Sequence, residues 1–317
     1  MTPDFTGFGG TVPSSAICLI VEKGVFSRPI RRREQVMEKN QIKKGALYVV
    51  GTPIGNLSDF SGRAIDTLRA VDFIAAEDTR VTAKLLNRFE IKKPLVSYFE
   101  HNKLQKGELI CQRLLEGESC ALVSDAGMPA ISDPGELLVA QCAEKGVPVF
   151  VVPGPSAVVS ALAVSGLPTG RFTFEGFLSM NKKSRRAHLA DVKNERRTMI
   201  FYEAPHKLVS TLEDMLEAFG DRKIAVVREL TKIHEEVFRT TLQGARTYYT
   251  QNPPKGEFVL VIGGAEEAPG EKSYTLEEAA ALAREKIAGG MSVNEAAKLA
   301  SGLSGIKKGD IYKAVLE

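Results

Sequence analysis

The sequence is poor in the residues that usually hold metals or covalent cross-links. It contains no tryptophan, four histidines and four cysteines in 317 residues. Neither the cysteines nor the widely separated histidines show metal-ligand spacing, and no C-x-x-C motif is present. A chain of this length can bury a sufficient core without disulfides. We therefore expect no metal site, reduced and unreactive thiols, and a cytoplasmic protein. The cysteines are Cys18, Cys111, Cys120 and Cys142.

Long hydrophobic runs and the common nucleotide-binding motifs are also missing. The longest apolar run near the N-terminus, Ala16 to Val21, is too short for a signal peptide and follows no basic segment. No run approaches the length that a bilayer requires. The chain also lacks the G-x-G-x-x-G fingerprint and the P-loop. We expect a soluble intracellular protein, and a dehydrogenase is disfavoured.

Charge is unevenly distributed along the chain. The net charge of +3 divides into +4 for residues 1–44, −3 for 45–170, +4 for 171–265 and −2 for 266–317. The basic third segment indicates an anionic partner. Residues 1–44 show no sustained periodicity, so we expect a poorly ordered extension, with Met37 as an alternative start. The run Arg31 to Arg33 is typical of a solvated tail, and a nucleic-acid contact is the other interpretation.

A βα rhythm begins after this extension. Continuous apolar runs at 46–50, 71–76, 121–123 and 147–152 predict buried strands. Helical patterns intervene, at 60–70 and around Leu85 and Leu86. Strands of this kind, alternating with helices, are typical of a mostly parallel sheet covered on both faces.

Loops rich in glycine, proline, serine or aspartate follow the four strands: GTPIGN, EDTR, SDAGMP and PGPS. Because ligands of open parallel sheets bind beyond the carboxyl ends of the strands, we expect the site there. Asp133 is followed by Pro134 and Glu136, which is typical of a helix start and predicts a structural role. Asp125 has no helix to cap and is the better candidate for holding a ligand. Gly127 allows a close approach of the backbone.

The pattern changes after a predicted linker at 165–171. Strands are expected at 172–178, 199–202, 223–227, 237–241 and 258–262, with helices at 206–219 and 242–249, as in a mixed sheet. The basic stretch NKKSRRAH (181–188) is either a flexible solvated loop or a contact to a nucleic-acid backbone. A second linker at 265–272 precedes a helical segment, in which 291–317 is helix-turn-helix-like and is either an RNA-docking element or a helical cap.

Charged side chains at the strand ends supply candidate catalytic groups. In EDTR, Asp78 with Arg80 forms either a helix cap with a surface ion pair, or part of a site in which a carboxylate is the base and Arg80 contacts phosphate. SYFEHN adds His101, although a lone histidine is more often structural. FYEAPHKL places Glu203 between a strand and a helix.

In their order along the chain, these stretches resemble one family. YVVGTPIGNLSD, FIAAEDTR, SYFEHN, LVSDAGMPAISDPG, VVPGPSA, SGLP, FEGFL, FYEAPHKL and RELTKIHEE are similar to the ribosomal RNA small subunit methyltransferase I group of the tetrapyrrole (corrin/porphyrin) methylases. The resemblance spans roughly 45–263. In this chain Met128 replaces the threonine common in SDAGTP, which could alter cofactor contacts. Ser179-Met180 replaces the usual proline after FEGFL, which could reshape the substrate loop.

The resemblance implies an enzyme that transfers a methyl group from S-adenosyl-L-methionine to the ribose 2′-hydroxyl of a cytidine, position 1402 in the decoding region of 16S rRNA. It implies two α/β domains with the cofactor in the cleft between them, and a homodimer. We thus expect an extension (1–44), two α/β domains (45–167 and 168–265) and a C-terminal helical domain (274–317). By motif, the cofactor contacts fall on Pro53, Asp125, Gly127, Ile131, Ser156, Ala157 and Tyr202, with Leu230 and Pro254 from the second domain.

Such a reaction needs no metal or covalent nucleophile, only alignment and a base for the hydroxyl proton. The candidates for that base are Glu77, Asp78, His101 and Glu203. Arg80 and Lys207 are candidates for holding phosphate, and Lys182, Lys183, Arg185 and Arg186 for binding RNA. Two other readings stay open at this point: a methylase of a tetrapyrrole intermediate, and a non-catalytic DNA-binding regulator.

Overall fold

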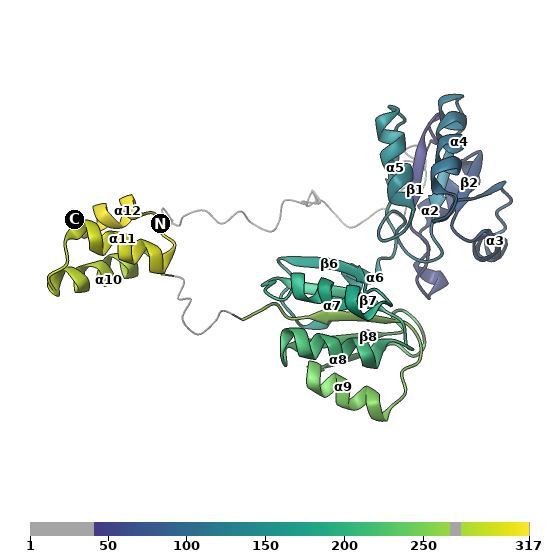
Figure 1. Cartoon of the computed structure of the whole chain (residues 1–317). Coiled ribbons are helices and arrows are strands. Elements are labelled where there is room, and N and C mark those ends of the chain that lie inside the picture. Colours follow the sequence, from purple (N-terminus) through teal and green to yellow (C-terminus); the bar gives the residue numbers. More distant parts are fainter. Residues whose placement is uncertain (1–40, 267–273, 317) are drawn as a thin grey trace, which may run out of the picture. The chain divides into compact units, whose positions relative to one another are not determined.

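The first sheet consists of five parallel strands in the order β3-β2-β4-β1-β5. Its strands β1 and β2 are labelled in Figure 1. The computed structural model describes residues 41–266 and 274–316, so Cys18, Arg31 to Arg33 and Met37 lie outside the described residues. The strands are β1 (Leu47–Val50), β2 (Phe73–Ala76), β3 (Leu95–Ser97), β4 (Cys120–Val123) and β5 (Val149–Val152). The predicted parallel sheet is confirmed. The edge strand β3 has only three half-buried residues and gave no apolar run to recognise.

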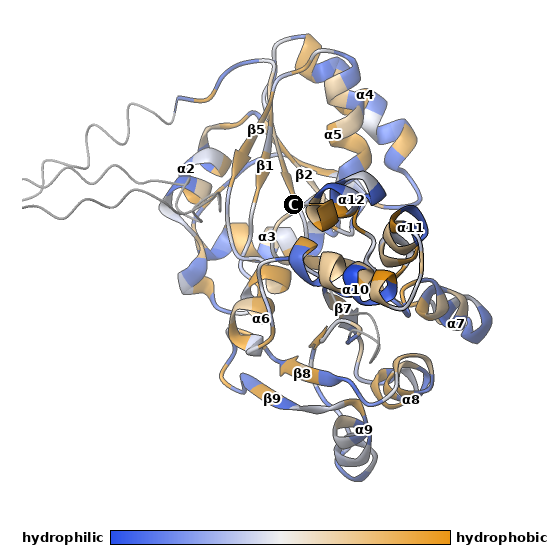
Figure 2. Cartoon of the chain, turned by 90° about the vertical axis from the view of Figure 1, so that its left-hand side faces the viewer, coloured by the Kyte–Doolittle hydropathy of each residue, from blue (hydrophilic) through white to orange (hydrophobic). Residues whose placement is uncertain are grey.

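Helices cover both faces of this sheet, because successive residues of each apolar strand point to opposite sides. Tyr48 and Val50 face a core formed with α2 (Gly62–Ala70) and α3 (Thr79–Arg88). Leu47 faces the opposite core, formed with α4 (Lys103–Leu115) and α5 (Gly135–Glu144). The labelled strands β1, β2 and β5 are largely hydrophobic in Figure 2. A 3₁₀ helix, η2 (Leu57–Asp59), precedes α2.

The second sheet is mixed, as the sequence predicts. Its order is β6-β7-β10-β8-β9, with β6 and β7 parallel and the other pairs antiparallel. Helix α6 lies on one face, where Val158, Ala161 and Leu162 are buried against β8 and β10. On the other face, α7, α8 and α9 form a larger core. The elements are α6 (Ala157–Ser165), β6 (Phe172–Phe177), α7 (Lys182–Asp191), β7 (Thr198–Glu203), α8 (Leu208–Phe219), β8 (Lys223–Arg228), β9 (Glu236–Thr241), α9 (Leu242–Gln251) and β10 (Phe258–Ile262).

The basic stretch at 181–188 is not a flexible loop, and that interpretation is wrong. It forms the start of α7, where the side chain of Asn181 accepts hydrogen bonds from the backbone N–H groups of Lys183 and Ser184. Arg185 and Leu189 are buried four residues apart on the inner face of this helix. The stretch has too few apolar residues to show a helical hydrophobic pattern, because a buried arginine takes one of the positions on the inner face of the helix.

Three helices follow the second sheet: α10 (Leu276–Ala288), α11 (Val293–Ser304) and α12 (Lys308–Leu316). Thr275 and Ser292 each form a capping box with the glutamate three residues later. Gly305 ends α11 in the left-handed conformation. The small core between the helices consists mainly of alanines and Ile311. The predicted helical segment is therefore confirmed.

The finer division of the chain into domains stays a prediction. Lys44, the last residue of the expected extension, forms an ion pair with the first α/β unit: its ammonium lies 2.9 Å from the carboxylate of Asp72. Within residues 41–266 and 274–316, no helix has the length and apolar character needed to cross a membrane.

Candidate active site

The loops after β1, β4 and β5 are held together by backbone contacts. Thr52 and Gly127 exchange two backbone hydrogen bonds, of 2.9 and 3.2 Å. Gly51 and Gly154 lie so close that a Cβ on Gly51 would be 2.6 Å from the Cα of Gly154. The N–H of Gly154 also points to the sulfur of Met128, 3.2 Å away. Three of the glycine- and proline-rich loops thus form one continuous surface at the carboxyl ends of the strands, as expected.

A pocket of about 500 Å³ opens beside this surface. The strand-end loops of the first sheet supply much of its wall. The second sheet and its loops supply the rest, including Phe177, Tyr202 and Val259. Tyr202 packs against Phe174 and Phe177, with ring centroids 5.0 and 5.2 Å away, and burial raises the pKa of its hydroxyl. The volume falls in the range of small-molecule sites, and the lining is mixed apolar and acidic.

The carboxylates of this pocket differ in their partners. Glu77, the residue after β2, is half-buried, and its carboxylate makes no hydrogen bond or ion pair with any described residue. Burial raises the pKa of Glu77 above its ordinary value, and the nearby carboxylates of Asp125, Asp133 and Asp78 raise it further. Asp125 is exposed and accepts a hydrogen bond of 3.0 Å from the N–H of Asp78. The pKa of Asp133 is also raised by burial, but Asp133 accepts backbone hydrogen bonds, so Glu77 is the carboxylate of this pocket with both a raised pKa and no hydrogen-bond partner among the described residues.

Asp133 has the structural role expected of it. Its Oδ1 accepts hydrogen bonds from the N–H groups of Gly135 (2.7 Å) and Ala130 (3.0 Å). Helix α5 begins at Gly135, one residue later than a cap by Asp133 would place it. Ala130 and Ser132 both have positive φ values, 66° and 63°. The carboxylate therefore stabilises an unfavourable loop conformation that presents Ile131, 53% exposed, to the pocket.

Asp78 and Arg80 follow the structural interpretation. Asp78 caps α3 by accepting a hydrogen bond from the backbone N–H of Arg80, and its Oδ2 lies 2.7 Å from Nη2 of Arg80. These hydrogen bonds lower the pKa of Asp78 to about 2. A carboxylate with that pKa is a poor proton acceptor near neutral pH. The Arg80 side chain is nonetheless 86% exposed, so its remaining N–H groups can reach a ligand.

Glu203 lines the pocket but is engaged in a buried network. It is 2% exposed and accepts hydrogen bonds from the hydroxyl of Thr211 (2.6 Å) and the N–H of Ala204 (2.9 Å). The ammonium of Lys207 lies 2.8 Å from Oε1 of Glu203 and donates to the carbonyl of Leu178 (3.2 Å). Lys207 is thus committed to this network and fixes the turn between β7 and α8.

His101 and Asn102 form part of the loop before α4. The amide oxygen of Asn102 accepts from the N–H of Phe99 (2.9 Å), and its amide nitrogen donates to the carbonyl of Ser97 (3.1 Å). His101 is exposed, stacks edge-on against Phe99 and does not line the pocket. The described residues contain no group of side chains that could hold a metal ion.

Residues 46–245 match the family described as Tetrapyrrole (Corrin/Porphyrin) Methylases. The ribosomal RNA small subunit methyltransferase I of Synechocystis sp. is 46% identical over 276 residues, which cover 86% of this chain and 98% of the relative. The protein of the same name from Thermotoga maritima is 50% identical over 222 residues, covering 70% of this chain and 100% of the relative. The chain belongs to the ribosomal RNA small subunit methyltransferase I group of the tetrapyrrole methylases.

A solved structure agrees with this assignment at the level of the fold. Uroporphyrin-III-C-methyltransferase from Thermus thermophilus matches with a TM-score of 0.50 and 21% identity, covering 69% of this chain and 94% of that chain. The predicted fold class and family are therefore confirmed.

The pocket of this methylase gathers most of the residues expected to contact the cofactor. Pro53 and Pro254 do not line it. The two chain neighbours of Pro53 do belong to the site: Ile54 lines the pocket, and Thr52 bonds to Gly127. The others do, and their roles in binding stay a prediction: Asp125, Gly127, Ile131, Ser156, Ala157, Tyr202 and Leu230.

The basic residues of α7 divide into two groups. Lys182 and Lys183 are exposed at its first turn. Arg185 is 7% exposed, and its guanidinium lies 2.7 Å from the carboxylate of Asp214, which is also buried. Arg186 lies 3.0 Å from the same carboxylate. The expectation that Arg185 binds RNA is thus wrong, because its guanidinium neutralises a buried carboxylate inside the protein.

Sequence reasoning missed several residues that line the pocket: Ile54, Phe177, Glu257 and Val259. Phe177 belongs to FEGFL, a stretch used for the resemblance, so its motif was a usable signal. Ile54 likewise lies within GTPIGN, whereas Glu257 and Val259 lie beside or on β10 without a distinctive pattern. Met128, noted as a departure from the usual threonine, lines the pocket and contacts Gly154.

Proposed function

We propose that the chain transfers a methyl group from S-adenosylmethionine to the ribose 2′-hydroxyl of a cytidine, at position 1402 of 16S rRNA. The names of the relatives support ribosomal RNA as the substrate. The main structural support for this type of reaction is the environment of the Glu77 carboxylate. It is half-buried in the pocket, has no partner among the described residues and has a raised pKa. Such a group is suited to take a proton from a hydroxyl.

The pocket fits the proposed cofactor. Gly51, Gly127 and Gly154 let backbone surround the site closely, and Ser156 presents the start of α6 to it. A helix N-terminus of this kind favours an anionic group such as a carboxylate. The acidic lining, with Glu77 and Asp125, complements a ligand with positive charge. When bound, S-adenosylmethionine supplies an activated methyl group on a positively charged sulfur.

The chain's own contribution to the reaction is alignment and proton acceptance. The ribose oxygen bonds to the methyl carbon while the carbon–sulfur bond breaks, and the hydroxyl proton passes to the carboxylate of Glu77. Holding the reacting atoms in line lowers the barrier without a metal or a covalent intermediate. Of the four candidate bases, Glu77 is favoured because Asp78 caps a helix, Glu203 is in an ion pair and His101 lies outside the pocket lining.

RNA contacts are proposed for three exposed cations. Arg80 stands at the first turn of α3, three residues after Glu77, and Lys182 and Lys183 stand at the first turn of α7. Lys207 positions Glu203 and does not reach the substrate, since its ammonium is used within the protein. Contacts of this kind bind phosphate without reading sequence, so the pocket must select the nucleotide.

A homodimer is proposed through β5 and the outer face of α6. Helix α6 has no charged residue and is mostly hydrophobic in Figure 2. Its inner face is buried, yet Val159 and the β5 residue Val151 are each 57% exposed. Exposed apolar side chains on two elements that are consecutive in the chain favour an interface. Val159→Glu should give a monomer in sedimentation velocity, whereas the matched control Leu115→Glu, at a 61% exposed position on α4, should not. A dimeric Val159→Glu protein would refute this interface.

The substrate is tested with labelled S-adenosylmethionine. The chain is incubated separately with 30S subunits that lack the modification, with protein-free 16S rRNA and with uroporphyrinogen III. Label on 30S subunits or rRNA alone supports the proposal, and the compartment would then be the cytoplasm, where ribosomes are. Label on the macrocycle alone would assign the chain to the tetrapyrrole-modifying branch of its fold.

A further inference from the structure

Helix α3 carries a row of cations on its exposed side. Arg80, Lys84 and Arg88 are spaced four residues apart, so they lie on one face, each about 6 Å further along the axis. The opposite face, with Thr82 and Leu86, is buried against the sheet. Lys92 and Lys93 follow in the loop that leads to β3. Over residues 79–93 there are five cations and one acid, Glu90.

These cations are not used to stabilise the fold. Apart from Arg80, which pairs with Asp78, none of the five forms an ion pair with any residue in 41–266 or 274–316. Arginines elsewhere on the surface behave differently, since Arg197 and Arg228 each pair with a nearby glutamate. A row of like charges with few acids beside it is unfavourable for the isolated protein and favours an anionic partner.

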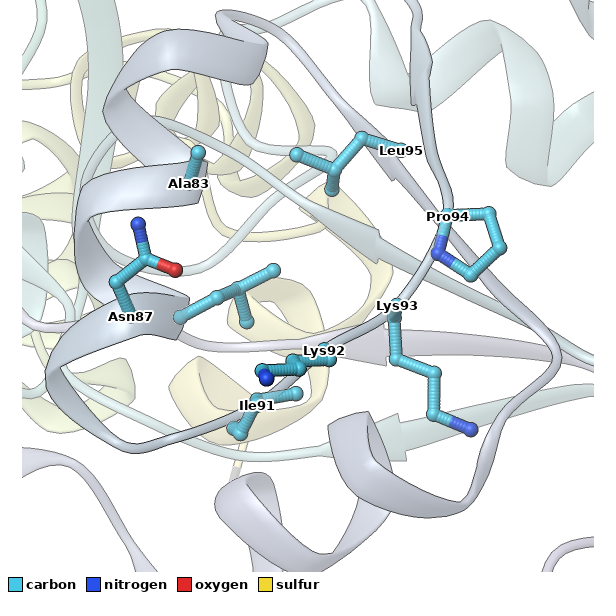
Figure 3. A pocket seen from close by; sticks show the side chains of 8 residues that line it. Ala83, Asn87, Ile91, Lys92, Lys93, Pro94 and Leu95 are labelled. Atoms are coloured by element: carbon cyan, nitrogen blue, oxygen red, sulfur yellow. The ribbon is translucent and has the colours of Figure 1, made fainter.

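A hollow of about 420 Å³ lies beside this row. Figure 3 shows Ala83 and Asn87 from α3 on one side of it, with Lys92, Pro94 and Leu95 from the loop and β3 on the other. Its walls are therefore apolar, with an amide and two ammonium groups at its border. Apolar side chains can cover an unstacked base by van der Waals contact while cations hold the adjoining phosphates.

The row begins at the proposed catalytic pocket. Glu77 lines the pocket, Asp78 caps α3, and the helix then runs away from the site through Lys84 to Arg88. A single RNA strand whose target ribose enters the pocket would thus find cations at successive turns of one straight helix. The pocket and the row are joined by consecutive residues of the chain.

We propose that α3 and the loop after it bind the rRNA strand that flanks the target nucleotide. Lys84 and Arg88 contact its phosphates, and the hollow bordered by Ala83 and Leu95 holds one unstacked nucleotide. This inference rests on the proposed function, because it takes RNA as the substrate. It assigns a binding role to residues that none of the recognisable motifs includes.

The test compares Lys84→Gln/Arg88→Gln with a control, Lys193→Gln/Lys223→Gln, which neutralises two exposed cations elsewhere. Binding to unmodified 30S subunits is measured by filter retention over a range of salt concentrations, and methyl transfer is measured separately. The α3 variant should lower the slope of log K against log salt by about 2. Its KM for 30S subunits should rise roughly tenfold with kcat unchanged. The control should match the wild-type protein.

A second variant, Ala83→Phe, fills the hollow and leaves the charges in place. It should raise the KM for 30S subunits while cofactor binding by calorimetry and thermal unfolding stay unchanged. An α3 double variant with the control's salt slope and KM would overturn the phosphate contacts, and an unchanged KM for Ala83→Phe would overturn the nucleotide site. Because binding is measured without turnover, wild-type protein that binds 30S subunits through α3 but transfers no methyl group would refute the proposed function alone.

Discussion

The backbone N–H of Asp78 donates a hydrogen bond of 3.0 Å to Oδ1 of Asp125. This bond joins the loops after β2 and β4, which are neighbours in the first sheet. It also places the charge of Asp125 beside Glu77, the residue before Asp78, and that charge contributes to the raised pKa of Glu77. One aspartate therefore orders the site and adjusts the proton affinity of the proposed base.

Replacing the proposed base should remove turnover without removing the cofactor site. Glu77→Gln keeps the shape of the side chain but cannot accept the proton, so kcat should fall by roughly 10²- to 10⁴-fold. Cofactor affinity by calorimetry should fall much less than kcat, because Asp125 still supplies negative charge to the pocket. His101→Gln is the matched control, because His101 was a candidate from the sequence and does not line the pocket. Near-normal turnover by Glu77→Gln would eliminate Glu77 as the base.

The pH dependence of kcat should report the pKa of Glu77. The base acts when deprotonated, so kcat rises with pH through that pKa and reaches its plateau above it. Burial, and then Asp125, place the pKa above the ordinary value of 4.5, so the acid limb should lie at higher pH than for an ordinary glutamate. Asp125→Asn removes one negative charge and should move the limb to lower pH at saturating cofactor. If the acid limb of the kcat profile of Asp125→Asn stayed in place or moved to higher pH, the charge of Asp125 would not be raising the pKa of Glu77.

Much of the first sheet could be predicted because its strands are buried on both faces and read as apolar runs. The loops were recognisable for the same reason, since Gly127 and Asp125 directly follow such a run. The state of each side chain could not be predicted. Only one of the two carboxylates, Glu77 or Asp78, caps α3, and the other is left without a partner. The sequence EDTR is compatible with either residue as the cap, and the structure shows that it is Asp78.

The α7 error has a different cause. Arg185 is surrounded in sequence by other cations, and its partner Asp214 lies in α8, 29 residues later. Only the packing of α7 on α8 brings the two together. A cation buried through a distant acid has the same local sequence as a cation that binds RNA, so composition alone could not separate Arg185 from Lys182.

Variants on α7 should separate stability from RNA binding. Arg185→Met leaves the buried Asp214 with Arg186 alone and should lower the free energy of unfolding by about 3 kcal/mol. Lys182→Gln/Lys183→Gln should leave unfolding unchanged and reduce the salt dependence of 30S binding. Chemical denaturation and filter binding measure the two effects. The reverse pattern would return Arg185 to the RNA-binding residues.

Gly51 and Gly154 bring the loops after β1 and β5 so close together that one added methyl group should lower stability. In Gly51→Ala the added Cβ would lie 2.6 Å from the Cα of Gly154, so the loops must separate. We expect a loss of about 1–3 kcal/mol in stability and weaker cofactor binding. The control is Gly62→Ala at the start of α2, where an added Cβ meets nothing within 4 Å. Equal behaviour of the two variants in thermal unfolding and calorimetry would show that the loops are not held as described.

The most direct measurement of the central claim is the position of the transferred methyl group. Unmodified 30S subunits are incubated with the protein and labelled S-adenosylmethionine, and nuclease digests of the 16S rRNA are analysed by mass spectrometry. The account predicts one methyl group on the ribose 2′-oxygen of cytidine 1402, formed roughly 10²- to 10⁴-fold more slowly with Glu77→Gln. A methyl group on a base, or on no nucleotide of the subunit despite demonstrated cofactor binding, would contradict it.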